Sequence, residues 1–173
     1  MKSRRLKTVR EVLDELSKDP EFVAAAKQRQ ALLDGREAQV RREEAPLVAD
    51  LQEAGVRVES VYDLVNRGDD YPNAIPVLRA HLQRPYTPPV LEGIVRALTL
   101  KDLRGVVNGE MWTLYDNQPG QQSRWVRTAI LLAFAVVGTR AADGARLQAI
   151  IADERASEDE RGTARNALSK LRR

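Results

Sequence analysis

Hydrophobic and polar positions follow a helix-pair pattern that occurs three times along residues 72–172. The pattern predicts first helices at 72–84, 105–117 and 140–155, and second helices at 88–104, 121–137 and 157–172. The second helices share an apolar ladder in which Ile94, Ile130 and Ala164 occupy equivalent places, at offsets of 36 and 34 residues. A fixed period in this range is typical of a stacked helical repeat, in which each helix pair packs against its neighbours.

Residues 1–45 have a weaker apolar pattern. A short helix is predicted at about 9–16, followed by a long, strongly polar helix over 20–44. Ala26, Leu33 and Val40 recur every seven residues, but Arg29 and Arg36 occupy intermediate positions and leave the apolar stripe too thin for a strong coiled coil. We expect a solvated helix that rests one edge on the repeats. The alternatives are a helix that forms a dimer and an arm that closes over a partner.

Prolines mark expected irregularities in two helices. Pro46 is expected to break the long helix and leave a separate short one at 46–54, because a proline inside a helix loses a hydrogen bond and clashes with the preceding turn. Pro76 predicts a kink in the first helix of the first pair. No segment alternates with a period of two residues, so no sheet is expected. The predicted fold is all-α: a short α-solenoid of about three helix pairs (71–104, 105–138 and 139–173) in a repeat domain of 46–173, preceded by a helical extension of 1–45.

Composition excludes several classes of protein. The chain has 43% hydrophobic and 31% charged residues, which is typical of a soluble packed domain, and it contains no cysteine. Disulfides, thiolate metal sites and cysteine nucleophiles are therefore excluded, and a reducing cytoplasm is the expected location. No apolar run approaches the ~20 residues of a membrane span, and we expect no membrane association and no signal peptide.

Charge is distributed unevenly along the chain. The net charge is +3, but residues 2–10 contribute +5, the residues after Glu160 contribute +5, and residues 11–160 have a net charge of −7. The basic isoelectric point near 9.4 therefore belongs to the two ends. A nucleic-acid-binding domain more often has its basic residues on the folded surface, so this distribution disfavours that function.

The apolar motifs of the repeats resemble those of a known family. Residues 74–78, Ala-Ile-Pro-Val-Leu, followed by Leu82, resemble the first helix of a HEAT repeat, and residues 126–134, which include Arg127, resemble the second. Motifs within residues 47–98 more specifically resemble those of small, uncharacterised bacterial HEAT-like proteins, and the resemblance covers about residues 46–173. The resemblance implies an armadillo-type helical fold and a binding function. The period is shorter than the ~40–47 residues of HEAT repeats, and Leu91 stands where the later repeats have Arg127 and Arg161.

Few residues have the pattern of a reactive site. His81 is the only histidine, and we interpret it as a surface or partly buried residue without a catalytic role, since zinc sites require further ligands. No Gly-rich phosphate loop is present, and we predict no catalytic, cofactor or metal site. Trp112 and Asp116 share one helical face and faintly resemble a cleft pair of HEAT-like alkylpurine DNA glycosylases. The preferred interpretation is that Trp112 anchors a repeat interface and Asp116 is a helix-end acid.

The preferred function is a non-enzymatic protein-binding scaffold or adaptor, of which an immunity-type inhibitor is one form. We expect the second helices to form a concave face that contacts a protein partner by surface complementarity. Nucleic-acid binding is the alternative, and a dimer through the N-terminal helix is a further one. The HEAT resemblance also implies a structural role for Arg127, as the partner of a neighbouring acid. The residues expected to face the partner are Glu92, Arg96, Arg124, Arg127, Arg161 and Arg165.

Overall fold

The computed structural model of the 173-residue chain describes residues 8–67, 70–118 and 123–171. It divides into two compact units, Met1–Gln39 and Val40–Arg173. All regular structure in the described residues is helical, with no β-strand, so the prediction of an all-α fold is confirmed. In the same residues, no helix is long and apolar enough to cross a membrane.

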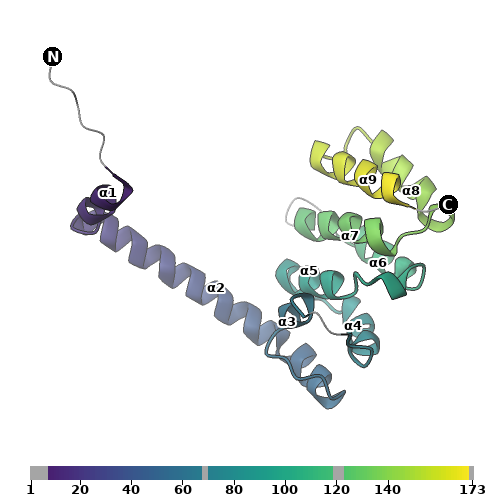
Figure 1. Cartoon of the computed structure of the whole chain (residues 1–173), viewed down its shortest axis with the longest axis horizontal. Coiled ribbons are helices and arrows are strands. Elements are labelled where there is room, and N and C mark those ends of the chain that lie inside the picture. The colour runs from purple at the N-terminus through teal and green to yellow at the C-terminus, as the bar shows by residue number, and fades with distance from the viewer. Residues whose placement is uncertain (1–7, 68–69, 119–122, 172–173) are drawn as a thin grey trace. The chain divides into compact units, whose positions relative to one another are not determined.

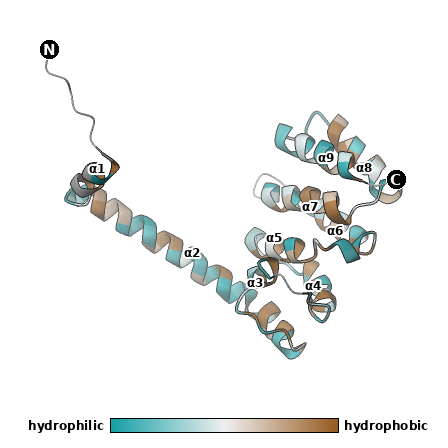
Figure 2. Cartoon of the chain, viewed as in Figure 1, coloured by the Kyte–Doolittle hydropathy of each residue, from teal (hydrophilic) through white to brown (hydrophobic). Residues whose placement is uncertain are grey.

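The first unit contains α1 (Val9–Leu16) and the first part of α2 (Pro20–Glu53). The carboxylate of Asp19 caps α2 by accepting a hydrogen bond from the backbone N–H of Glu21 at 2.9 Å. The observed bounds of α1 match the predicted 9–16. Hydrophobic and hydrophilic residues alternate along α2 (Figure 2), and none of the side chains described between residues 8 and 39 is buried. These residues therefore have no core within their own unit.

Helix α2 continues through Pro46, so the predicted break there is wrong. A proline in a helix costs about 3 kcal/mol, but residues on both sides of Pro46 are fixed by tertiary contacts. Before it, the Glu44 carboxylate accepts a hydrogen bond from the backbone N–H of Val61. After it, Leu47 and Leu51 are fully buried, and each contributes about 1.5–3 kcal/mol by that burial. This packing outweighs the cost of the proline.

The larger unit continues with α3 (Val61–Val65), α4 (Ala74–Leu82), α5 (Pro88–Ala97), α6 (Asn108–Asp116), α7 (Arg124–Val137), α8 (Arg140–Ala152) and α9 (Glu158–Lys170). A short 3₁₀ helix, η1 (Lys101–Leu103), lies between α5 and α6. In Figure 1 the helices of this unit follow one another from α3 to α9 in chain order. Helix α5 packs against α3, α4 and α7, helix α7 packs against α5, α6 and α9, and α8 packs against α9. The second helix of each predicted pair thus contacts the second helix of the next.

Several helices are shorter than predicted. Helix α4 begins at Ala74 rather than residue 72, so Pro76 lies in the first turn, where its lack of an N–H is tolerated. The second helix expected at 88–104 ends at Ala97 and is followed by η1. Gly105 has a φ of 75°, a conformation that favours glycine, and α6 starts after it. The predicted ends at residues 121 and 172 lie outside the described residues.

The core of the larger unit follows the predicted ladder. Ile94, Ile130 and Ala164 are all fully buried. In the same core, Phe134 of α7 stacks on Trp112 of α6, with 4.2 Å between ring centroids. The interior also contains the buried carboxylate of Asp143 at the start of α8, which accepts a hydrogen bond from the Trp112 indole N–H at 2.8 Å. Helix α7 is therefore held on several sides by its neighbours.

Candidate partner-binding surface

The six residues predicted to contact a partner lie on the three helices that pack in succession. Helix α5 carries two of them, α7 two and α9 two. Each forms an ion pair within the chain. The exposed pairs among them contribute at most about 1 kcal/mol each, and the pairing leaves little net charge for a ligand. The surface is therefore less cationic than its arginines alone suggest.

Arg127 joins α7 to α9. Its Nε lies 2.8 Å from Oε1 of Glu160, an ion pair without the alignment of a hydrogen bond, and Glu160 is nearly buried. Its guanidinium also lies over the ring of Tyr115, 4.7 Å from the centroid, and Nη2 donates to the Tyr115 hydroxyl at 3.0 Å. These contacts match the structural role expected for Arg127. Removing it would leave a nearly buried carboxylate without its counter-ion.

The other five residues also pair locally. Arg124 bonds Asp159 across the α7–α9 interface. Arg161 and Arg165 both bond Glu158, at 2.8 and 3.1 Å, and their hydrogen bonds lower the pKa of that carboxyl.

On α5, Arg96 lies 2.6 Å from Glu92, one helical turn earlier. The structure thus brings Arg124 of α7 to an acid of α9, Asp159, whereas Arg161 and Arg165 pair with Glu158 within α9 itself. Arg96 and Glu92 form a separate pair on α5.

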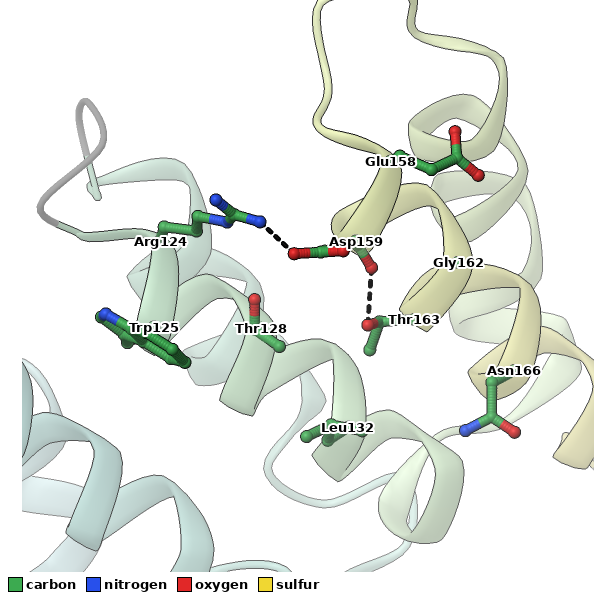
Figure 3. Close-up of a pocket in the computed structure, with 9 residues that line it drawn as sticks. All are labelled: Arg124, Trp125, Thr128, Leu132, Glu158, Asp159, Gly162, Thr163 and Asn166. Carbon is green, nitrogen blue, oxygen red and sulfur yellow. Dashed lines mark hydrogen bonds and ion pairs between the residues drawn. The ribbon is translucent and has the colours of Figure 1, made fainter. Parts of the chain in front are cut away.

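A groove runs between α7 and α9 (Figure 3). Its volume is about 570 Å³. The Arg124–Asp159 pair spans one end of it, and the Thr163 hydroxyl donates to the Asp159 backbone carbonyl at 2.7 Å along one wall. The lining residues are Arg124, Trp125, Thr128, Leu132, Glu158, Asp159, Gly162, Thr163 and Asn166.

A second hollow of about 360 Å³ lies beside the first. It is lined by residues of α5 and α7, including Arg96 and Ala133, and by Val65 at the end of α3. Leu132 lines both hollows. The outer side of α7 therefore faces two adjoining depressions, one against α9 and one against α5.

Two apolar residues at this surface were not among the predicted contacts. Trp125 is 72% exposed and Leu132 is 48% exposed. Residues 125–137 are apolar nearly all round in sequence, a pattern typical of a helix buried between two neighbours, but these two side chains are exposed. They lie seven residues apart, so they share one side of the helix, roughly opposite the buried Ile130 and Phe134. The sequence did contain a signal for this exposure. Trp125 and Leu132 form a second apolar stripe on a helix that already has a buried one.

Trp112 and Asp116 have structural partners. Trp112 is 5% exposed and lies between Phe134 and the guanidinium of Arg146, whose Cζ is 4.3 Å from the indole centroid. Asp116 bonds the same Arg146 at 2.6 and 2.8 Å. The indole face is thus covered on both sides. This agrees with the interpretation of Trp112 as an interface anchor and leaves it no face on which to stack a base.

His81 is fully buried, so its prediction as a surface or partly buried residue is wrong. Its Nε2 lies 2.7 Å from Asp50 Oδ2 and its Nδ1 lies 2.7 Å from the Tyr86 hydroxyl. Because a carboxylate only accepts hydrogen bonds, Nε2 carries the proton and Nδ1 accepts from Tyr86 in the neutral ring. The hydrogen bond from His81, with the nearby charge of Arg84, lowers the pKa of Asp50. The cluster fastens α4 to the last part of α2.

Comparisons with known proteins give no relative from which to transfer a function. No protein-family model, curated protein or solved structure matches the chain significantly. Within the described part of the chain, no group of three or more histidine, cysteine, aspartate or glutamate side chains could hold a metal ion. The candidate site therefore rests on the geometry of α5, α7 and α9.

Proposed function

We propose that the helix pairs of residues 72–171 form a HEAT-like α-solenoid whose α5–α7–α9 face binds a protein partner without catalysing a reaction. The serial packing of α5, α7 and α9 supports the solenoid. The exposure of Trp125 and Leu132 at two adjoining hollows is the observation that carries the binding function. Tryptophan and arginine are enriched among the residues that dominate binding energy at interfaces, and Arg124 lies beside Trp125.

The surface chemistry favours a partner segment with apolar side chains flanked by charges of both signs. Trp125 and Leu132 offer apolar area about two helical turns apart, roughly 10 Å along α7. Around them, Arg124 pairs with Asp159 and Arg96 pairs with Glu92. A strongly acidic ligand such as nucleic acid would have to displace these internal acids. A protein segment of mixed charge can add to the pairs that already exist.

The proposal can be tested by filling the groove. Gly162 of α9 lines it, and apart from its chain neighbours and the backbone of its own helix no atom lies within 4 Å of the place where a side chain would begin. Gly162→Leu therefore adds a side chain to the groove without a clash at its first carbon, and leucine also favours the helix over glycine. Gly109 of α6 is equally open but does not line either hollow, which makes Gly109→Leu the matched control.

The measurement is photo-crosslinking in the native host, with benzoylphenylalanine placed at position 125. We expect one stoichiometric protein adduct, retained with Gly109→Leu and reduced at least about tenfold with Gly162→Leu, equivalent to a loss of 1.4 kcal/mol. An adduct that is unchanged by Gly162→Leu, or no protein adduct at all, contradicts the proposal. A nucleic-acid adduct in its place would support the alternative function.

A further inference from the structure

The N-terminal unit has apolar residues that nothing in its own described structure covers. Phe22 is 43% exposed and Leu33 is 50% exposed, and Val9 and Leu13 of α1 are exposed as well. Most helical stability in proteins comes from packing an apolar face, and isolated helices are marginal in water. The first part of α2 therefore has an apolar side that a partner helix would stabilise.

The residues on that side follow a heptad seam. Phe22, Ala26, Arg29, Leu33 and Arg36 are spaced alternately by four and three residues, the spacing with which two helices pack side by side. Two of these five positions are arginines. In the described residues neither has an ion-pair partner, so the seam presents two unpaired positive charges. An occupant must supply apolar side chains, and each arginine needs either an acid opposite it or a route to solvent.

A second copy of the same segment meets that requirement when it runs in the opposite direction. Residues 8–21 contain five acidic and two basic residues, whereas residues 22–36 contain three basic residues and one acidic residue. Antiparallel pairing places the acidic part of each copy beside the basic part of the other. Parallel pairing would place like charges together, which is unfavourable.

One register satisfies both the packing and the charges. With the two-fold axis between residues 27 and 28, Phe22 faces Leu33 of the other copy and Asp19 faces the other copy's Arg36. In the same register, Ala26 faces Arg29, so that the small alanine leaves room for the arginine stem while the guanidinium reaches solvent. Each of these contacts occurs twice in the pair because of the symmetry.

We propose that the chain forms an antiparallel homodimer through residues 19–36 of α2 in this register. This inference is independent of the function proposed for the α5–α7–α9 face. The seam of 18 residues is about 27 Å long, which is short for a two-helix contact. The dimer should therefore dissociate on dilution.

The first test is sedimentation equilibrium of the full chain from low-micromolar to submillimolar concentration. We expect a mass that rises from the 19.4 kDa of the monomer to twice that value. Leu33→Asp should weaken the dimer at least about tenfold. Ala31→Asp introduces the same residue on the opposite side of the helix and should leave the dissociation constant unchanged. A monomer at every concentration, or equal effects of the two variants, would overturn the proposal.

The second test addresses direction and register by exchanging charges. Arg36→Glu and Asp19→Arg should each weaken self-association, because each places like charges opposite one another twice. Mixed in equal amounts, the two variants restore both opposite-charge contacts and should form a heterodimer, detected by native mass spectrometry. Asp19→Arg also removes the carboxylate that caps α2. The mixture controls for this loss, because the Asp19→Arg chain lacks the cap in the mixture as well. If the mixture associates no better than either variant alone, the antiparallel register is wrong.

Discussion

The two phenylalanines of the chain lie in opposite environments. Phe134, in the larger unit, is fully buried against Trp112, while Phe22, in the N-terminal unit, is 43% exposed on the surface of a helix. Both belong to α-helices with several other apolar residues. The difference arises from neighbours: α7 has helices packed against it, and the described residues of the N-terminal unit contain no buried side chain.

This contrast shows that helical pattern and tertiary burial are separate properties. The larger unit obtains its stability from interdigitated apolar side chains and from a few buried polar contacts such as those of Asp143. The N-terminal unit has helix-forming residues and caps, but it needs another surface to bury its apolar side. Substitutions in the two units should therefore affect stability to different extents, and their effects should differ in how they depend on protein concentration.

The largest expected difference is between Phe134→Ala and Phe22→Ala. The first leaves a cavity beside Trp112 and should lower the free energy of unfolding by about 3–5 kcal/mol. Phe22→Ala removes a partly solvated ring and should change the free energy of unfolding by less than about 0.5 kcal/mol at concentrations where the chain is monomeric. Urea unfolding followed by circular dichroism measures both. Similar losses in the two variants would mean that Phe22 is buried in the monomer.

Much of the helical organisation could be predicted because local signals and packing agree there. Ser157 and Glu160 form the capping box that starts α9, and Gly55 ends α2 with a φ of 81°. Pro46 shows where local signals fail, since α2 passes through it on the strength of contacts with residues distant in the chain. Helix ends depend on such contacts, and sequence alone does not supply them.

A smaller difference is expected between two aspartates. Asp143 is fully buried and accepts hydrogen bonds from the side chain of Asn108, from the indole of Trp112 and from the backbone N–H of Thr139. Asp143→Ala leaves these buried donors unsatisfied, and leaving such a group unsatisfied costs about 1–3 kcal/mol. The variant should therefore lower the free energy of unfolding by about 2–3 kcal/mol in all.

The matched control is Asp34→Ala in the N-terminal unit, where the carboxylate is exposed and bonds only the Gln30 amide among the described residues. Asp34→Ala should change the free energy of unfolding by no more than about 0.5 kcal/mol. The comparison again uses urea unfolding. Equal values for the two alanine variants would show that water reaches the Asp143 site and satisfies its donors.

The candidate surface was predictable in part. The sequence placed six charged residues on predicted second helices, and the structure has them on α5, α7 and α9; the repeat offset of 34 residues aligns Arg127 with Arg161. The HEAT resemblance led us to expect such a pairing for Arg127. For others such as Arg124 the sequence did not reveal it, since the pairing of Arg124 with Asp159 depends on how α7 and α9 pack. It also missed Trp125 and Leu132, because an apolar residue on an apolar helix is expected to be buried.

The smallest effect concerns pH, at the end of α2 that belongs to the larger unit. The hydrogen bond from His81 lowers the pKa of Asp50 below its ordinary value of 3.8. A carboxylate with a lowered pKa stabilises the folded state fully above its unfolded value, and this contribution is lost as the pH falls through the folded value. Asp50→Asn removes the charge at every pH. The stability difference between wild type and variant should therefore persist from neutral pH to about pH 4 and close below it.

The difference should be modest because the Asp50 side chain is 43% exposed and solvent screens its interaction with His81. Added salt should reduce the stability difference between wild type and variant further at neutral pH. Urea unfolding of the two proteins at a series of pH values down to about pH 2 measures the gap. A gap that stays constant below pH 4 would show that the charge of the Asp50 carboxylate is not its source. No gap at any pH would show that the Asp50–His81 contact holds α2 to α4 through its hydrogen bond alone, since an amide oxygen can accept that bond as the carboxylate does.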